Sequence, residues 1–71
     1  MTERETTRAD TIRFAIESEI FNGSVVPGTS LEEGRLAARF GVSRTPVREA
    51  ITQLVQAGLI SKSAHRRAVV S

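Results

Sequence analysis

The sequence predicts a mainly α-helical domain that ends in a small β-hairpin, and three observations support this fold class. Apolar residues recur every four positions near the amino end, as on one face of a helix. Two further helical segments follow, separated by a turn of only three or four residues. Beyond them, two apolar groups flank a polar stretch, which is the pattern of a hairpin. Helix, short strand, helix, turn, helix and hairpin is the order of a winged helix-turn-helix.

Length and composition limit what the chain can be. A chain of 71 residues is one small domain at most, and its core is modest because such domains bury only about 60% of their unfolded surface. It has no cysteine, so it has neither disulfides nor thiolate metal sites, which suits a reducing compartment. No segment approaches the ~20 apolar residues that span a bilayer, and no signal-peptide pattern opens the chain. We therefore expect a cytoplasmic protein with no membrane partner.

Charge divides the chain into two unequal parts. Residues 1–33 hold three arginines against seven acidic residues, a formal charge of −4. From residue 34 onward, six arginines and one lysine face one glutamate, a formal charge of +6. A basic cluster of this kind is typical of proteins that meet phosphate, and a solvated basic face is the alternative. Residues 1–8 are polar and aperiodic, so we expect a flexible arm there and a domain over residues 9–71.

The first helix is predicted from Ala9 onward by a row of three isoleucines. The residues of this row are Ile12, Ile16 and Ile20. Asn22 and Gly23 tolerate the left-handed conformation found just past a helix, so we expect the helix to end there. Phe14 and Phe21 lie beside the isoleucine row and are expected at the edges of the core.

The segment between the first and second helices combines β-branched residues with a turn. Residues 25–28, VVPG, predict a short edge strand followed by a turn. Ser30 and Glu33 have the spacing of a capping box, which predicts where the second helix begins. Gly41 is expected to end this helix.

The third helix is predicted to have one buried face and one polar face. Ser43 is placed to cap it, and Pro46 falls at its third position, where no backbone N–H is needed for an intrahelical bond. The buried arc holds Val47, Ala50, Ile51 and Leu54, with Gly58 at its end. The outward arc holds Arg44, Thr45, Arg48 and Thr52.

The outward arc has the residue types that read DNA. In a helix-turn-helix the second helix enters the major groove with its amino-terminal residues against base edges. Arg44 and Arg48 lie one turn apart at that end, and an arginine can donate two hydrogen bonds to guanine, worth ~1–3 kcal/mol of discrimination. Ser43 and Thr45 suit phosphate oxygens, and Pro46 keeps the helix tip rigid.

The alternative for these arginines is a solvated helix face. Glu49 is the acidic residue available nearby, and it projects away from Arg44 on the helical wheel, so no internal neutralisation is predicted. Arg35 and Arg39 lie four apart on the second helix, where they would face the phosphate backbone or the groove entrance. For Arg39 a solvated position is an equal alternative.

The predicted hairpin tip is basic. His65, Arg66 and Arg67 could enter a minor groove, whose narrow form attracts arginine, although a lone surface histidine often contacts nothing. The chain offers few residues for catalysis, because it has one histidine, no cysteine, no converging carboxylates and no glycine-rich phosphate loop. The sequence therefore predicts no enzyme, no cofactor and no metal site.

The run GVSRTPVREAI, followed by LVQAGLI, is highly specific, and a longer pattern of a P-G turn, L-x-E and L-A can be followed from Ile12 to Ile60. In these residues the chain resembles the winged-helix DNA-binding domain of the GntR family of bacterial transcription regulators. The T-P-V-R-E-A form resembles the FadR-like subgroup, whose larger carboxy-terminal domain is all-helical.

The resemblance implies roles for particular residues. Arg35 matches a DNA-contacting position at the start of the second helix, Arg44 and Arg48 match the two recognition-helix arginines, and Ser43 and Thr45 match the hydroxyl positions. Such regulators are dimers that bind inverted repeats, usually as repressors released by a small carboxylate or sugar-acid metabolite. The resemblance implies that this chain is a fragment, and that the full-length homodimer binds its effector through a carboxy-terminal domain.

Two positions depart from the family pattern. The wing SAHRRAVV has no glycine beside its basic residues, and Glu32 stands where the family has a small capping residue, which allows a helix start two residues later than Ser30.

The favoured hypothesis is sequence-specific binding of double-stranded operator DNA. A winged helix used as a protein-interaction module is the alternative, and it would need an exposed apolar patch. Single-stranded RNA binding would need exposed aromatic side chains, and the chain has three phenylalanines, no tyrosine and no tryptophan.

Overall fold

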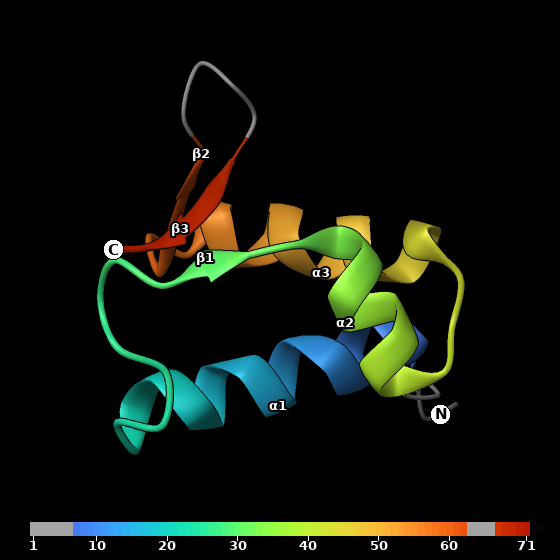
Figure 1. Ribbon diagram of the computed structural model, residues 1–71, viewed down its shortest axis with the longest axis horizontal. Helices are drawn as coiled ribbons and strands as arrows, with labels where there is room; N and C mark the ends of the chain where they lie inside the picture. Colours follow the sequence, from blue (N-terminus) through green and yellow to red (C-terminus); the bar gives the residue numbers. More distant parts are fainter. Residues whose placement is uncertain (1–6, 63–66) are drawn as a thin grey trace, which may run out of the picture.

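Three helices and a three-stranded sheet form the domain in the computed structural model, which describes residues 7–62 and 67–71 (Figure 1). In chain order the elements are α1 (Arg8–Phe21), β1 (Ser30–Leu31), α2 (Glu33–Phe40), α3 (Arg44–Gln56), β2 (Ile60–Lys62) and β3 (Ala68–Val70). The predicted winged helix-turn-helix is confirmed. No helix in the described part of the chain is long and apolar enough to cross a membrane.

Helix α1 begins slightly earlier than the isoleucine row indicates. Thr7 is its N-cap, and the Asp10 backbone N–H donates to the Thr7 hydroxyl at 3.0 Å while the Thr7 N–H donates to the Asp10 carboxylate at 3.3 Å. This reciprocal pair satisfies two N–H groups at the helix start. Thr7 and Arg8, predicted to lie in the arm, therefore belong to the helix terminus. Gly23 has φ of 84° just past the helix, as predicted.

The phenylalanines of α1 are not at the edge of the core, contrary to the prediction. Phe14 and Phe21 keep 51% and 75% of their surface exposed. The reason is that α1 packs mainly against α3, so only the isoleucine face is covered. Phe40 of α2 does pack against the core, and the guanidinium of Arg39 lies 4.7 Å from its ring centroid.

The edge strand forms after the P-G turn and not before it. Residues 25–28 are not a strand, because the chain must first reverse at Gly28, whose φ is 90°. Past this turn, the Val70 N–H donates to the Thr29 carbonyl at 2.9 Å and β1 begins. The sheet is antiparallel throughout, in the order β1-β3-β2, and Ser30 lies opposite Val69.

The placement of Ser30 in β1 removes the predicted capping box. Helix α2 begins at Glu33 with Glu32 as its N-cap, two residues later than the Ser30 cap would place it, and the Glu32 side chain makes no capping hydrogen bond. Gly41 ends α2 in the left-handed conformation, with φ of 66°, as predicted.

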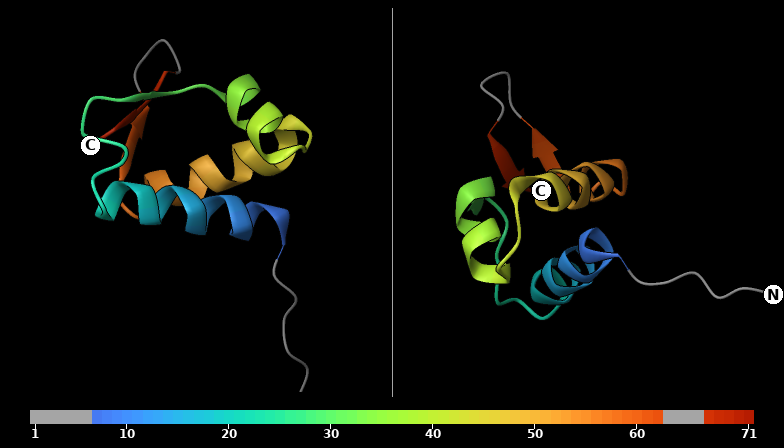
Figure 2. Two further views of the ribbon diagram at one scale, coloured as in Figure 1. Left: turned by 60° about the horizontal axis from the view of Figure 1, so that its bottom comes forward. Right: turned by 90° about the vertical axis from the view of Figure 1, so that its right-hand side faces the viewer.

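Helix α3 is the central element of the core. Its buried residues are Val47, Ala50, Ile51 and Leu54, as predicted. They pack with Ile12 and Ile16 of α1, Leu36 of α2 and Ile60 of β2. In two further views α3 lies between α1 on one side and the hairpin on the other, while α2 covers one end (Figure 2). The start of α3 and the hairpin are thereby presented together on the side away from α1.

Candidate nucleic-acid interface

An open groove of about 760 Å³ lies between the first turn of α2, the start of α3 and the two hairpin strands. The charged residues that line it are Arg44, Arg48, Lys62, Arg67, Glu32 and Glu33. Four basic residues from three separate segments therefore converge with two acidic residues that follow one another in the chain.

Arg44 and Arg48 are the predicted base-reading residues, and both are exposed on the first turns of α3. Their spacing of four residues puts them on one face of the helix. Arg44 extends across the first turn of α2, since a Cβ built on Gly34 would lie 2.9 Å from Arg44 Nη2 and 3.5 Å from its Cζ. The structure thus brings both arginines to the same groove.

Arg48 has an acidic partner that the helical wheel did not predict. Its Nε donates to both Glu33 carboxylate oxygens at 3.3 and 3.4 Å, and its Nη2 donates to Oε1 at 3.3 Å. The prediction that Glu49 is the available acidic residue was wrong, because Glu33 comes from the neighbouring helix, 15 residues earlier in the chain. A wheel of α3 alone cannot show such a contact.

The ion pair does not withdraw Arg48 from solvent. The Arg48 side chain is 59% exposed and that of Glu33 is 25% exposed. Exposed ion pairs are worth ~0–1 kcal/mol, whereas a bidentate contact with guanine is worth ~1–3 kcal/mol of discrimination. The contacts with Glu33 use Nε and Nη2, so the Nη1 edge of the exposed guanidinium can still meet a base edge.

The other predicted residues at the α3 start are placed as the sequence indicates. Ser43 is the N-cap, but its hydroxyl makes no capping hydrogen bond within the described residues, and Pro46 is the third helical residue. Ser43 and Thr45 are both exposed. Exposed hydroxyls beside the first N–H groups of a helix suit phosphate oxygens.

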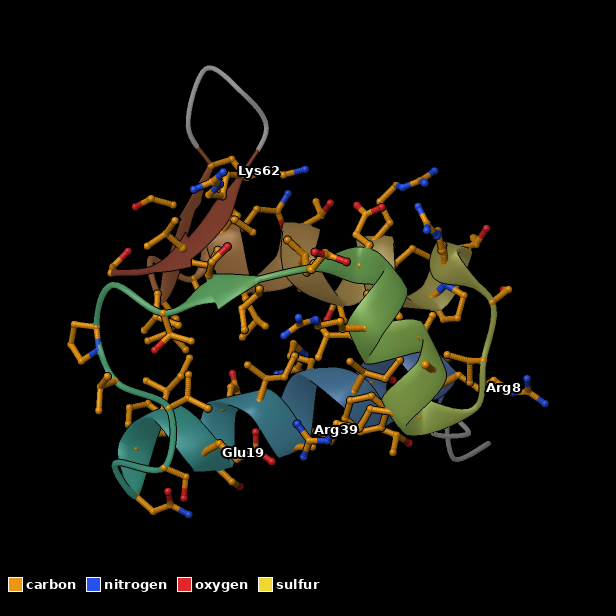
Figure 3. The ribbon with its side chains drawn as sticks, viewed as in Figure 1. Arg8, Glu19, Arg39 and Lys62 are labelled. Carbon is orange, nitrogen blue, oxygen red and sulfur yellow. The ribbon has the colours of Figure 1, made fainter. Side chains whose placement is uncertain are left out.

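Arg35 and Arg39 diverge on α2. Arg35 is exposed. Arg39 instead lies against Glu19 of α1, on the opposite side of the molecule from Lys62 (Figure 3). Its Nη1 donates to Glu19 Oε1 at 3.0 Å and its Nη2 bonds the second carboxylate oxygen. The predicted contact of Arg39 with phosphate is therefore not supported.

The two hydrogen bonds between Arg39 and Glu19 also shift the pKa values of both groups. The hydrogen bonds from Arg39 lower the pKa of Glu19, outweighing the opposite effect of burial. The same hydrogen bonds raise the pKa of Arg39. This pair fastens α2 to α1 and takes no part in the groove.

The hairpin contributes Lys62 from the end of β2 and Arg67 from just before β3, and both side chains line the groove. His65 and Arg66, predicted at the tip, lie outside the described residues. The groove residues that sequence reasoning did not assign to the site include Glu33, which was expected only in a helix cap, and also Gly34 and Lys62.

The second helix of this helix-turn-helix presents two arginines beside a basic wing. This combination is characteristic of winged-helix DNA-binding domains. Residues 8–70 match the family described as bacterial regulatory proteins, gntR family, and the chain belongs to this family. The predicted resemblance is confirmed at the level of the family. Because the family consists of regulatory proteins, the prediction that the chain is not an enzyme is confirmed as well.

Three similar proteins illustrate the match. A probable D-xylose utilization operon transcriptional repressor of Paenarthrobacter nicotinovorans is 40% identical over 60 residues, which cover 84% of this chain and 26% of that protein. A GntR-family regulator of Pseudomonas syringae superposes with a TM-score of 0.84 at 41% identity, over 90% of this chain and 27% of that one.

The third is the DNA-binding domain of AraR in complex with operator ORX1, with a TM-score of 0.85 at 29% identity, over 100% of this chain and 87% of that one. The chain spans 20–26% of the length of the first curated relatives it matches.

Proposed function

We propose that this chain reads operator DNA by placing the start of α3 in the major groove, where Arg44 and Arg48 donate to guanine O6 and N7. The observation that carries this proposal is the convergence of two exposed arginines, one turn apart, on a groove that the hairpin completes. The AraR DNA-binding domain, which is similar over the whole chain and is in complex with an operator, supports operator DNA as the partner.

Phosphate contacts complete the proposed complex. Ser43 and Thr45 lie at the start of α3, where hydroxyls and helix N–H groups can bond the backbone of the duplex, and Arg35 is exposed in the first turn of α2. Lys62 and Arg67 at the hairpin would contact phosphates of the DNA backbone beside the adjacent groove. Contacts of this type position the protein, whereas the two arginines of α3 supply the base preference.

In the full-length protein we propose a homodimer that binds an inverted repeat, and a small-molecule effector bound by another domain. One relative is named as a probable transcriptional repressor, which supports repression of transcription as the effect of operator binding. A single domain would bind one half-site weakly, and two linked copies would regain affinity through effective concentration. Membership of the FadR-like subgroup stays a prediction. The interaction-module alternative is not favoured, because the outward face of α3 is polar and the exposed apolar residues Phe14, Phe21 and Val26 lie on α1 and in the loop after it, outside the groove.

The test is a titration of the chain against two duplexes over a range of salt concentrations. One duplex is recovered by selection from a random pool, and the other is a scrambled duplex of the same base composition. We expect tighter binding of the selected duplex and a linear fall of log K with log salt, because phosphate contacts release counterions. Arg39→Ala should bind both duplexes like the unsubstituted chain, since Arg39 is held by Glu19. Salt-insensitive binding, or equal affinity for both duplexes, would contradict the proposal.

A further inference from the structure

The first turn of α2 contacts both arginines of the recognition helix through two consecutive residues. Glu33 accepts hydrogen bonds from Arg48, and the next residue, Gly34, lies beneath the guanidinium of Arg44. We propose that Glu33 and Gly34 are positioning residues for base reading, so that α2 sets the specificity of α3 without touching a base. This inference rests on the proposed reading of guanine by these arginines.

Gly34 has no local reason to be glycine. It lies in the first turn of α2, and its φ is not in the left-handed region, so any L-residue could adopt its backbone conformation. Glycine in a helix is also less favourable than alanine, because it loses more backbone entropy on folding. The missing side chain must therefore serve something other than the fold of α2.

Arg44 supplies that reason. A Cβ on Gly34 would lie 2.9 Å from Arg44 Nη2, closer than real Cβ atoms approach another heavy atom, while its next neighbour beyond Arg44, Glu32 Oε1, would be 3.8 Å away. The group that would have to yield is the far end of a flexible side chain and not the backbone. Even a single methyl group at position 34 would therefore leave the fold intact and displace the Arg44 guanidinium.

Glu33 acts on Arg48 in a complementary way. A free arginine samples many rotamers, and ordering it on DNA costs conformational entropy. Three hydrogen bonds to Glu33 restrict Arg48 to the groove before DNA arrives. The same carboxylate repels phosphate, which weakens binding to all duplexes alike. Glu33 is thus expected to raise discrimination at the expense of total affinity.

The variants Gly34→Ala and Glu33→Gln test the proposal, with Ala38→Gly as a matched control. Ala38 is exposed on the same helix and lies away from the groove residues. Affinities of each 71-residue variant for the selected and the scrambled duplex are measured by fluorescence anisotropy, and folding is followed by thermal denaturation.

We expect Gly34→Ala to keep or raise the melting temperature while its ratio of selected to scrambled affinity falls roughly 3- to 10-fold, part of the value of one bidentate contact. Ala38→Gly should do the opposite, lowering the melting temperature and leaving the ratio unchanged. Glu33→Gln should strengthen binding to the scrambled duplex and lower the ratio. In the Arg44→Ala background, Gly34→Ala should have no further effect, because both act on one contact.

Several results would overturn the inference. If Arg44→Ala lowers the ratio but Gly34→Ala does not, Gly34 does not position Arg44. If Glu33→Gln strengthens both duplexes equally, Glu33 acts by charge alone. If the unsubstituted chain prefers no duplex, the proposed function fails, and this inference fails with it.

Discussion

Replacing Arg48 by alanine separates its two roles, because the structure assigns a different magnitude to each. In the free protein Arg48 loses only an exposed pair with Glu33, so the free energy of unfolding should fall by no more than ~1 kcal/mol. On DNA the lost bidentate contact should cost ~1–3 kcal/mol, or about 5- to 150-fold in affinity, on the selected duplex. Titration of the selected and scrambled duplexes measures the second effect, and thermal denaturation measures the first.

The refuting result concerns the ratio of the two affinities. Loss of a phosphate contact would weaken selected and scrambled duplexes alike and would lower the salt slope by about one. Equal losses on both duplexes for Arg48→Ala would therefore refute base reading by this residue. A large fall in stability would instead refute the inference that the Glu33 pair is weak.

Three further predictions concern folding. Glu19→Gln should remove stability of no more than ~1 kcal/mol at neutral pH, since both partners are partly exposed. The hydrogen bonds from Arg39 lower the folded-state pKa of Glu19 below its unfolded value, so this contribution is present above the unfolded pKa and is lost as the pH falls through the lowered pKa. The variant and the parent should therefore converge in acid denaturation curves. Leu54→Ala should lower the free energy of unfolding by ~2–5 kcal/mol, because it leaves a cavity at a fully buried position. The midpoint of a denaturant titration should fall accordingly, and an unchanged midpoint would contradict the assigned core. Thr7→Ala should lower stability by about 0.5–2 kcal/mol through loss of the α1 cap. Thr52→Ala removes only a hydroxyl that donates to the Arg48 carbonyl within α3, so it should lower stability less. Equal effects of the two substitutions would argue against the capping box.

Local signals predicted most of the fold. The isoleucine row of α1, the buried arc of α3 and the glycine that ends α2 each depend on neighbours within one or two helical turns, and these residues lie where the sequence indicates. The strand β1 was misplaced because its position depends on pairing with β3, nearly 40 residues later in the chain. Ser30 could not act as a cap once it had joined that sheet.

In the candidate site too, features within one helix were predicted and contacts between helices were not. Arg44 and Arg48 were identified from their spacing and from the proline beside them, which are properties of one helix. Their contacts with Glu33 and Gly34 arise from the packing of α2 beside α3, which no periodicity within either segment records. Arg39 was misassigned for the same reason, since its partner Glu19 lies on α1.

If the arginines of α3 touch nucleobases, guanine N7 is the acceptor that can be removed with least disturbance to the duplex. In the selected duplex each guanine is replaced in turn by 7-deazaguanine, which keeps Watson–Crick pairing, and the affinities of the unsubstituted chain and of Arg48→Ala are compared. We expect one position at which the unsubstituted chain loses affinity and Arg48→Ala does not. Equal sensitivity of both proteins at every guanine would contradict this expectation.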